Sequence, residues 1–264
     1  TVDLSDESSR YFLLPSNMPV RRGQIRNLRK IEQGLENIRR FPSIQSDMQL
    51  VPGEKEGESK LVVQRKQNRP IRLTLGADDS GSDYTGKHQG NATLSIDNPL
   101  GLGDMFFASI NRNLEGKSVY GTRGYGLHYS VPFGYWQLSA NTNSYDYHQM
   151  VAGNVTDYEY SGESQNSNIE LSRVIFRNGK AKTSVSAGGW LTTSRNFIDG
   201  TELEIQRRSM AGWELGVNHR HYIGNATVDA GLRFKKGTGA LNSLRATEED
   251  NDEGTSRSEI LNFN

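Results

Sequence analysis

The feature that most constrains this sequence is a period of two that runs from residue 71 to residue 234. Apolar Ile71, Leu73, Leu75 and Ala77 alternate with polar or small residues. The same alternation returns at residues 124–131, 136–141, 184–192, 213–218 and 226–234. Successive side chains of a β-strand point to opposite faces of the sheet. The pattern therefore predicts strands with one apolar and one polar face.

Turns separate these segments at regular intervals. Residues 97–104 read Asp-Asn-Pro-Leu-Gly-Leu-Gly-Asp, where the proline lacks a backbone donor and the glycines reach conformations that other residues resist. Strands are predicted on either side, at 87–96 and 105–111. Roughly nine strand segments follow from this pattern. Short connections lie at 132–134, 177–179 and 222–225, and longer polar ones at 115–122, 147–163, 195–202 and 235–257.

Two architectures fit the alternation. A soluble sandwich buries its apolar face against a second sheet, whereas a membrane β-barrel turns that face to lipid and its polar face to a hydrated lumen. Charges in the middle of strands, aromatic residues near strand ends, and the alternation of short and long connections favour the barrel. No membrane-spanning helix is expected, because the longest apolar run has four residues.

The barrel hypothesis assigns each face of the strands. Four charged residues are expected to line the lumen: Arg72, Arg123, Glu214 and Arg233. Four leucines are expected to face lipid: Leu73, Leu127, Leu215 and Leu232. An open set of nine strands would leave two unpaired edges in lipid. We therefore expect the barrel to be incomplete within this chain, which starts at Thr1 and is expected to come from a longer precursor.

Residues 1–66 have a different pattern, that of an α+β unit. Asn27 is a candidate N-cap, and an apolar stripe of Leu28, Ile31, Leu35 and Ile38 at helical spacing follows it. Pro42 ends this helix. Strands are predicted at 46–51 and 59–66, with a further strand before residue 6 and a short helix near 11–17. The expected order is βααββ.

In such a unit the strand 59–66 is expected to lie in the centre and the strand 46–51 at an edge. An open edge can bind an extended client by adding a strand to the sheet. The candidate cargo-binding residues are Ser46, Asp47, Met48, Gln49, Leu50 and Val51. Proline substitutions at residues 47, 48 and 49 are the proposed test, because proline removes a backbone donor.

Composition excludes several classes of function. The chain has 31 basic and 31 acidic residues, so no global charge favours nucleic acid. It has no cysteine, and its five histidines lack the spacing of metal ligands. No nucleophile elbow, phosphate loop or H-E-x-x-H motif occurs. We expect a protein that is not an enzyme and needs neither cofactor nor metal.

Several short motifs carry a family resemblance. They are residues 27–38, Pro52-Gly53, Asp78-Asp79-Ser80-Gly81 with Thr85-Gly86, residues 97–104, Pro132-Phe133-Gly134, and Arg177-Asn178-Gly179 with Lys182. Their types and order resemble the two-partner secretion outer-membrane transporters (TpsB) of the haemolysin secretion/activation type, within the Omp85 superfamily. The chain is especially similar to the transporters of contact-dependent inhibition toxins.

The resemblance implies a mostly β fold in two parts. Residues 1–66 would form much of a second POTRA domain, and residues 67–264 the first part of a 16-stranded antiparallel transmembrane β-barrel. It implies a location in the outer membrane of a Gram-negative bacterium, with the POTRA domain in the periplasm.

The implied function is the translocation of a large unfolded exoprotein (a toxin, haemolysin or adhesin of the TpsA type) to the cell surface. The transporter would recognise this partner through the partner's N-terminal secretion domain, contact outer-membrane lipid and act as a monomer. The alternatives are an Omp85-type assembly factor for outer-membrane proteins and a soluble β-rich adhesin or binding module.

Overall fold

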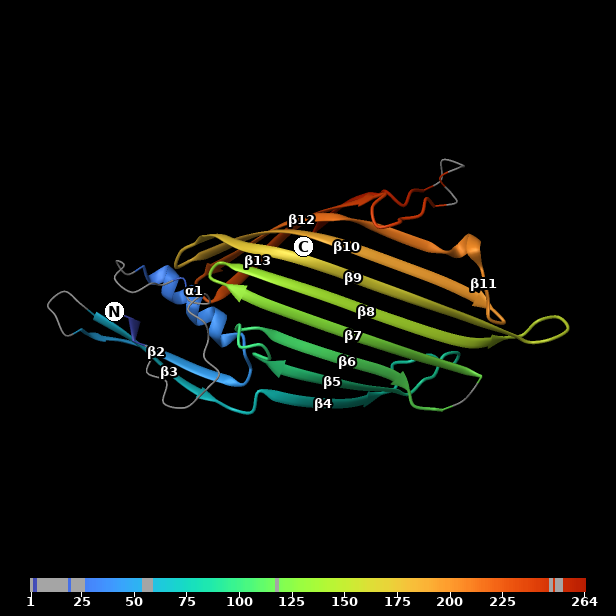
Figure 1. The fold of residues 1–264 in the computed structure, drawn as a ribbon, viewed down its shortest axis with the longest axis horizontal. Helices are drawn as coiled ribbons and strands as arrows, with labels where there is room; N and C mark the ends of the chain where they lie inside the picture. The colour runs from blue at the N-terminus through green and yellow to red at the C-terminus, as the bar shows by residue number, and fades with distance from the viewer. Residues whose placement is uncertain are drawn as a thin grey trace.

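The protein is described by a computed structural model that covers residues 2–3, 19, 27–53, 59–116, 119–246, 249 and 254–264. It contains a small sheet with one α-helix, followed along the chain by a separate, large antiparallel sheet (Figure 1). Within these residues no helix has the length and apolar character of a membrane span.

The N-terminal domain is a three-stranded sheet in the order β1-β3-β2. The central position of β3 and the edge position of β2 confirm the sequence prediction. Strand β1 pairs with β3 in parallel and β2 pairs with it antiparallel, while the predicted helix near 11–17 lies outside the described residues. The elements are β1 (Val2–Asp3), α1 (Leu28–Arg39), β2 (Ile44–Pro52) and β3 (Ser59–Gln67).

Helix α1 starts where its cap predicts, because the side chain of Asn27 accepts a hydrogen bond from the backbone N–H of Arg29 at 2.9 Å. Ile31 and Ile38 are buried on one side of the helix. Leu28 was predicted to join them, but its side chain is 60% exposed. It is the first helical residue and lies beyond the part of the helix that packs on the domain.

The large sheet is a meander in which every strand pairs with its neighbours in sequence. It has ten successive strands instead of nine, because the last segment of the chain pairs with β13. Short β11 (Thr201–Glu202) pairs with β10 and precedes the 3₁₀ helix η2 (Glu204–Gln206). The ten strands are β4 (Ile71–Asp78), β5 (Gln89–Asp97), β6 (Met105–Asn113), β7 (Tyr120–Phe133), β8 (Trp136–Val151), β9 (Tyr158–Arg177), β10 (Ala181–Ile198), β12 (Arg208–Ile223), β13 (Ala226–Thr238) and β14 (Glu259–Phe263).

The middle strands are longer than predicted. The predicted loops 147–163 and 195–202 are in large part strand, since β8, β9 and β10 have 16, 20 and 18 residues. A 20-residue strand is roughly 66 Å long, well beyond a hydrocarbon core of about 30 Å. Apolar alternation stops where contact with lipid stops, but the backbone hydrogen bonds continue. The β8–β9 hairpin therefore extends past the other strands at the end away from the N-terminal domain (Figure 1).

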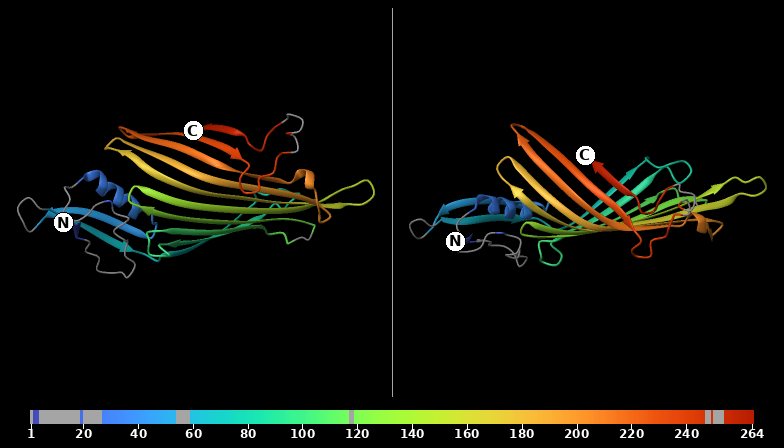
Figure 2. Two further views of the ribbon diagram at one scale, coloured as in Figure 1. Left: turned by 45° about the horizontal axis from the view of Figure 1, so that its top comes forward. Right: turned by 90° about the horizontal axis from the view of Figure 1, so that it is seen from above.

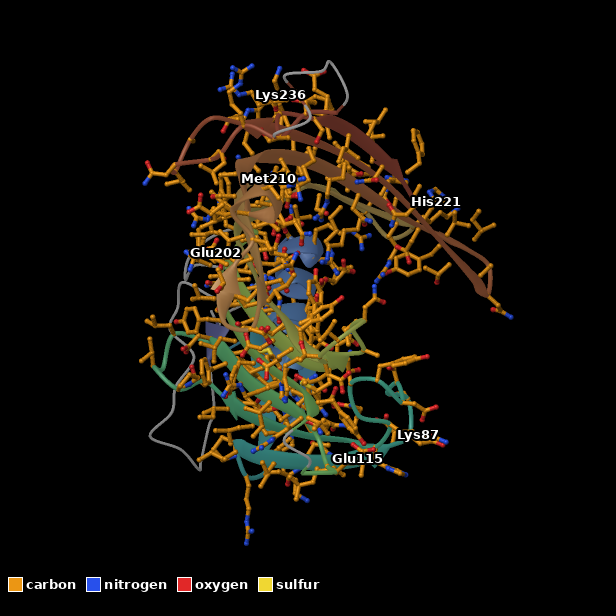
Figure 3. The ribbon with its side chains drawn as sticks, turned by 90° about the vertical axis from the view of Figure 1, so that its right-hand side faces the viewer. Lys87, Glu115, Glu202, Met210, His221 and Lys236 are labelled. Atoms are coloured by element: carbon orange, nitrogen blue, oxygen red, sulfur yellow. The ribbon has the colours of Figure 1, made fainter. Side chains whose placement is uncertain are left out.

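The sheet is strongly curved, and its polar face is the concave one. Arg233 on β13 reaches Glu170 on β9 at 3.4 Å, although β12 and β10 lie between them. Side chains three strands apart can meet only on the inside of a curve, because neighbouring strands are about 4.8 Å apart. Figure 2 shows the sheet as an open trough, and Figure 3 looks along it with α1 beyond.

The convex face carries the apolar residues and is uncovered. Leu73, Ile169 and Leu215 have exposed fractions of 64%, 53% and 50%. Cross-strand pairs such as Leu215–Phe234 and Leu171–Ala187 continue this apolar surface from strand to strand. A water-soluble sandwich would bury these side chains under a second sheet. In the described residues this face instead has the pattern of a barrel wall in contact with lipid.

Candidate functional site

The concave face carries a charged cluster near its middle. Glu214 on β12 is 7% exposed and pairs with Arg233 at 3.2 Å, while Arg233 also pairs with Glu170 at 3.4 Å. The ammonium of Lys235 lies 3.9 Å from the ring centre of Trp190. Serine and asparagine residues surround this cluster and line a cavity of about 410 Å³. Opposite charges are thus matched on a polar, hydrogen-bonding surface.

Arg72 shares this concave face at one edge of the sheet. Strand pairing places it opposite Ser95, and from there the register continues along the same face through Phe107 and His128. Its guanidinium donates to the carboxylate of Asp97 at 3.1 and 3.4 Å. The side chain of Asp97 is 1% exposed, so Arg72 neutralises a buried charge at the start of the residue 97–104 turn.

Arg123 lies on the other face. It is four residues from Leu127 on β7, and residues an even number apart on a strand share a face. Its guanidinium pairs with Asp146 at 2.9 Å, and its side chain is 57% exposed on the convex side. The predicted set of four charged residues is therefore split, because the prediction weighed charge above the parity of the strand. By the same rule of parity, Tyr145 and Tyr147 on β8 lie on the concave face.

Helix α1 docks on the turns at the near end of the large sheet, first on the β9–β10 turn. The carboxylate of Glu36 accepts hydrogen bonds from Lys182 and from Arg177. Arg177 also donates to the side chain of Gln33 at 2.8 Å. Partial burial raises the pKa of Glu36, but the hydrogen bonds from Lys182 and Arg177 outweigh it and hold the pKa below its ordinary value.

The second contact is with the end of β7 and the β7–β8 turn. The side-chain amide of Asn37 donates to the carbonyl of Gly134 at 2.9 Å, and Arg40 donates to the hydroxyl of Ser130. Burial lowers the pKa of Arg40, and the charge of Asp104 partly opposes this. A cavity of about 160 Å³ lies between the helix and concave residues such as Gln137. Helix α1 thus covers this end of the concave face.

The third contact is with the turn at residues 97–104. The backbone N–H of Ser43 donates to Asp97 at 3.1 Å. Asp104, whose side chain is fully buried, accepts from the backbone N–H groups of Leu100 and Leu102. Asn98 has a φ of 58° and Gly103 a φ of 75°, so the left-handed backbone explains the residue types of the motif. We call the three contacts together the dock.

Sequence reasoning missed the dock. It predicted only the apolar stripe of α1 and assigned no partner to the polar residues of the helix, yet Gln33 and Asn37 are 4% and 7% exposed. The available signal was a stripe of uncharged polar residues at helical spacing among charged ones. The turn motifs that carried the family resemblance are the partners of that stripe.

Strand β2 presents an edge whose free groups can now be assigned. Opposed residues of an antiparallel pair alternate between those that exchange two hydrogen bonds and those that exchange none. Asn68 donates to the carbonyl of Ser43 at 2.8 Å, so that pair is a bonded one. The register then turns the backbone groups of Asp47 and Gln49 toward β3. Among the six predicted cargo residues, the backbone groups facing outward belong to Ser46, Met48 and Leu50.

One of these outward groups already has a partner. Arg39 reaches the carbonyl of Ser46 at 3.5 Å. The edge is nine residues long instead of the predicted six. Among the described residues no group of His, Asp and Glu side chains has the arrangement of a metal site.

Comparison with known proteins places both parts of the chain. The model of the haemolysin secretion/activation protein family ShlB/FhaC/HecB matches residues 57–264, and a POTRA domain model matches residues 1–52. The chain is 38% identical over 231 residues to outer membrane transporter CdiB-2 of Burkholderia pseudomallei, covering 85% of this chain. It is 29% identical over 219 residues to hemolysin transporter protein ShlB of Serratia marcescens, covering 81% of this chain. It spans 39% of the length of each relative.

A solved structure shows the same fold. CdiB from Escherichia coli superposes with a TM-score of 0.89 at 27% identity. The match covers 94% of this chain and 46% of that one.

Proposed function

Because the chain belongs to the haemolysin secretion/activation protein family, we propose that it forms a POTRA domain and part of the barrel wall of an outer-membrane pore for two-partner secretion. The observation that carries this proposal is that the curved sheet has its polar face on the concave inside and its apolar face on the convex outside. Matched charges and amide groups on the concave face suit the passage of an unfolded chain of mixed composition.

The proposed orientation follows from the two ends of the sheet. The POTRA domain and the short turns lie at one end, and the long hairpins at the other. Barrels of the outer membrane have short turns in the periplasm and long loops outside. The POTRA domain is therefore in the periplasm, where it meets the N-terminal secretion domain of a large exoprotein. The transporter acts as a monomer.

The edge of β2 is the proposed place of cargo capture. An extended client that pairs with it gains backbone hydrogen bonds without demanding a particular sequence. This suits a transporter of an unfolded chain with strand-forming repeats. The outward N–H and carbonyl of Met48 lie in the middle of this edge.

The test uses proline substitutions in the full-length transporter. Met48→Pro removes an outward donor, which edge strands tolerate, and we expect it to reduce exoprotein secretion while the barrel still assembles and conducts. Met48→Ala keeps the donor and is the matched control. Gln49→Pro removes a bond to β3 and should destabilise the POTRA sheet itself. Normal secretion by Met48→Pro would move the capture site elsewhere.

A further inference from the structure

The convex face carries a row of charges near the end that is away from the POTRA domain. Strand pairing sets Arg112 opposite Arg123, Arg123 opposite Asp146, and Asp146 opposite Glu163. The row continues from Glu163 to Arg195 on β10. It thus crosses five neighbouring strands on the side that faces lipid.

The row lies at the level expected for lipid headgroups. Glu163 is six residues beyond Ile169, an exposed apolar residue of the same face, which is about 20 Å along the strand. The convex-face aromatic Trp136 lies at the opposite end of the apolar surface, where the guanidinium carbon of Arg173 is 4.8 Å from the centre of its ring. The two levels bracket the apolar residues as the two interfaces of a membrane would.

Charge matching along the row is incomplete at one end. Asp146 pairs with Arg123 at 2.9 Å, and Glu163 pairs with Arg195 at 3.5 Å. Across the described residues, no acidic group lies within ion-pair distance of Arg112, which directly opposes the like charge of Arg123. Like charges directly opposite on a sheet repel each other. An anion between the two guanidinium groups would remove that repulsion.

A groove is present at this point. It has a volume of about 730 Å³, and the convex-face residues Arg112, Arg123, His148 and Phe197 line it together with the acids of the row. The two arginines supply donors, and the ring of Phe197 supplies apolar surface next to the lipid-facing side. Glu159, a further acid of the groove, lies four residues beyond Glu163 on β9 and is farther from the arginines.

We infer that this groove binds the phosphate of a membrane lipid in the leaflet away from the POTRA domain. Arg112 and the free nitrogen of Arg123 hold the phosphate, and the acyl chains run down the apolar convex face below it. The phosphate-bearing lipid is chosen over free phosphate because the groove opens onto the lipid-facing surface. The inference rests on the membrane orientation in the proposed function, but not on secretion.

The test is lipid binding to full-length transporter in detergent, measured by titration in native mass spectrometry. The probe is bisphosphorylated lipid A. Arg112→Gln and Arg123→Gln should each weaken its binding about tenfold, the size of one lost charge-assisted hydrogen bond. Arg173→Gln, on the same face at the other membrane level, is the matched control and should bind as the wild type does. Heat-modified gel mobility confirms that each variant has a folded barrel.

Two further arms distinguish the sources of the phosphate. Lipid A without its phosphates should not bind to the groove, and millimolar inorganic phosphate should compete only weakly. Equal binding by wild type and Arg112→Gln, or equal binding of dephosphorylated lipid, would overturn the inference. Strong binding of inorganic phosphate together with weak binding of lipid A would show an anion site unrelated to lipid. A wild-type full-length transporter that binds lipid A but secretes no exoprotein would count against the proposed function alone.

Discussion

The two sheets of this chain obey opposite rules of burial. In the POTRA domain Ile31, Ile38, Phe41 and Ile44 are buried. In the large sheet large apolar side chains such as Leu215 and Ile169 are exposed on the convex face, and most of the buried residues are polar, such as Ser130 at 1% exposure. Apolar side chains thus point into the core of the POTRA domain but away from the concave face of the large sheet. The surroundings of a sheet, and not its pattern of alternating apolar and polar residues, decide whether the apolar face is turned inward or outward.

The largest effect should come from a charge on the convex face. Leu215→Arg places a guanidinium in lipid and should cost about 2–4 kcal/mol of stability at the midplane. Glu214→Gln, its neighbour on the concave face, should cost below about 1 kcal/mol, because Glu170 still pairs with Arg233. Denaturant titration of the full-length protein in lipid vesicles measures both. A similar loss of stability in the two variants would show that the convex face is not the one in contact with lipid.

A smaller loss of stability is expected at the turn of residues 97–104, where buried polar groups of the large sheet meet the POTRA domain. Asp104→Ala leaves the N–H groups of Leu100 and Leu102 without their acceptor in a buried turn, and should cost about 2 kcal/mol. Asp78→Ala, in an exposed turn at the other end of the sheet, should change stability by less than about 0.5 kcal/mol. The same titration applies. If the two alanine variants were equally stable, the turn would owe its order to glycine geometry alone.

The smallest effect is a pH dependence of the dock. The pKa of Glu36 is held below its ordinary value of 4.5, so the ionised form stabilises the dock. That contribution is complete above the ordinary value and is lost as pH falls through the lowered pKa. Spin labels at Arg39 and Lys180 should report a fixed distance at pH 7 and a broader distribution below about pH 4.

The control for this prediction is Glu36→Gln, which cannot ionise. Its distance distribution should already be broad at pH 7 and should not change with pH. A narrow distribution in that variant would show that Asn37 and Ser43 hold the dock without the ion pairs.

Much of the fold was predictable from local pattern. The alternation identified most strands, the cap of Asn27 gave the start of α1, and the residue types of the 97–104 turn matched its left-handed backbone. Strand ends were not predictable, because backbone pairing continues after the apolar signal stops. The dock was not predictable either, since no local pattern says that Glu36 will meet Arg177 from another domain.

For the candidate site, the position of a residue along its strand (odd or even) predicted its face better than its charge did. Arg72, Glu214 and Arg233 share one face, and Arg123 could have been placed correctly by counting from Leu127. The orientation of the β2 backbone needed one observed hydrogen bond, that between Asn68 and Ser43, because sequence alone does not set which residues of a pair are bonded.

The dock also has a consequence for the order of events during assembly. Its contacts join residues far apart in the chain: Asn37 and Gly134 are separated by 97 positions, and Glu36 and Lys182 by 146. The POTRA sheet needs only residues within its own span, so it can fold first. Helix α1 gains its last partners only when β9 and β10 have paired, because closing so long a loop costs entropy that the earlier strand pairs must offset. The dock is thus complete only after seven strands of the barrel wall are in place, whereas its contacts with the 97–104 turn and with Gly134 can form earlier.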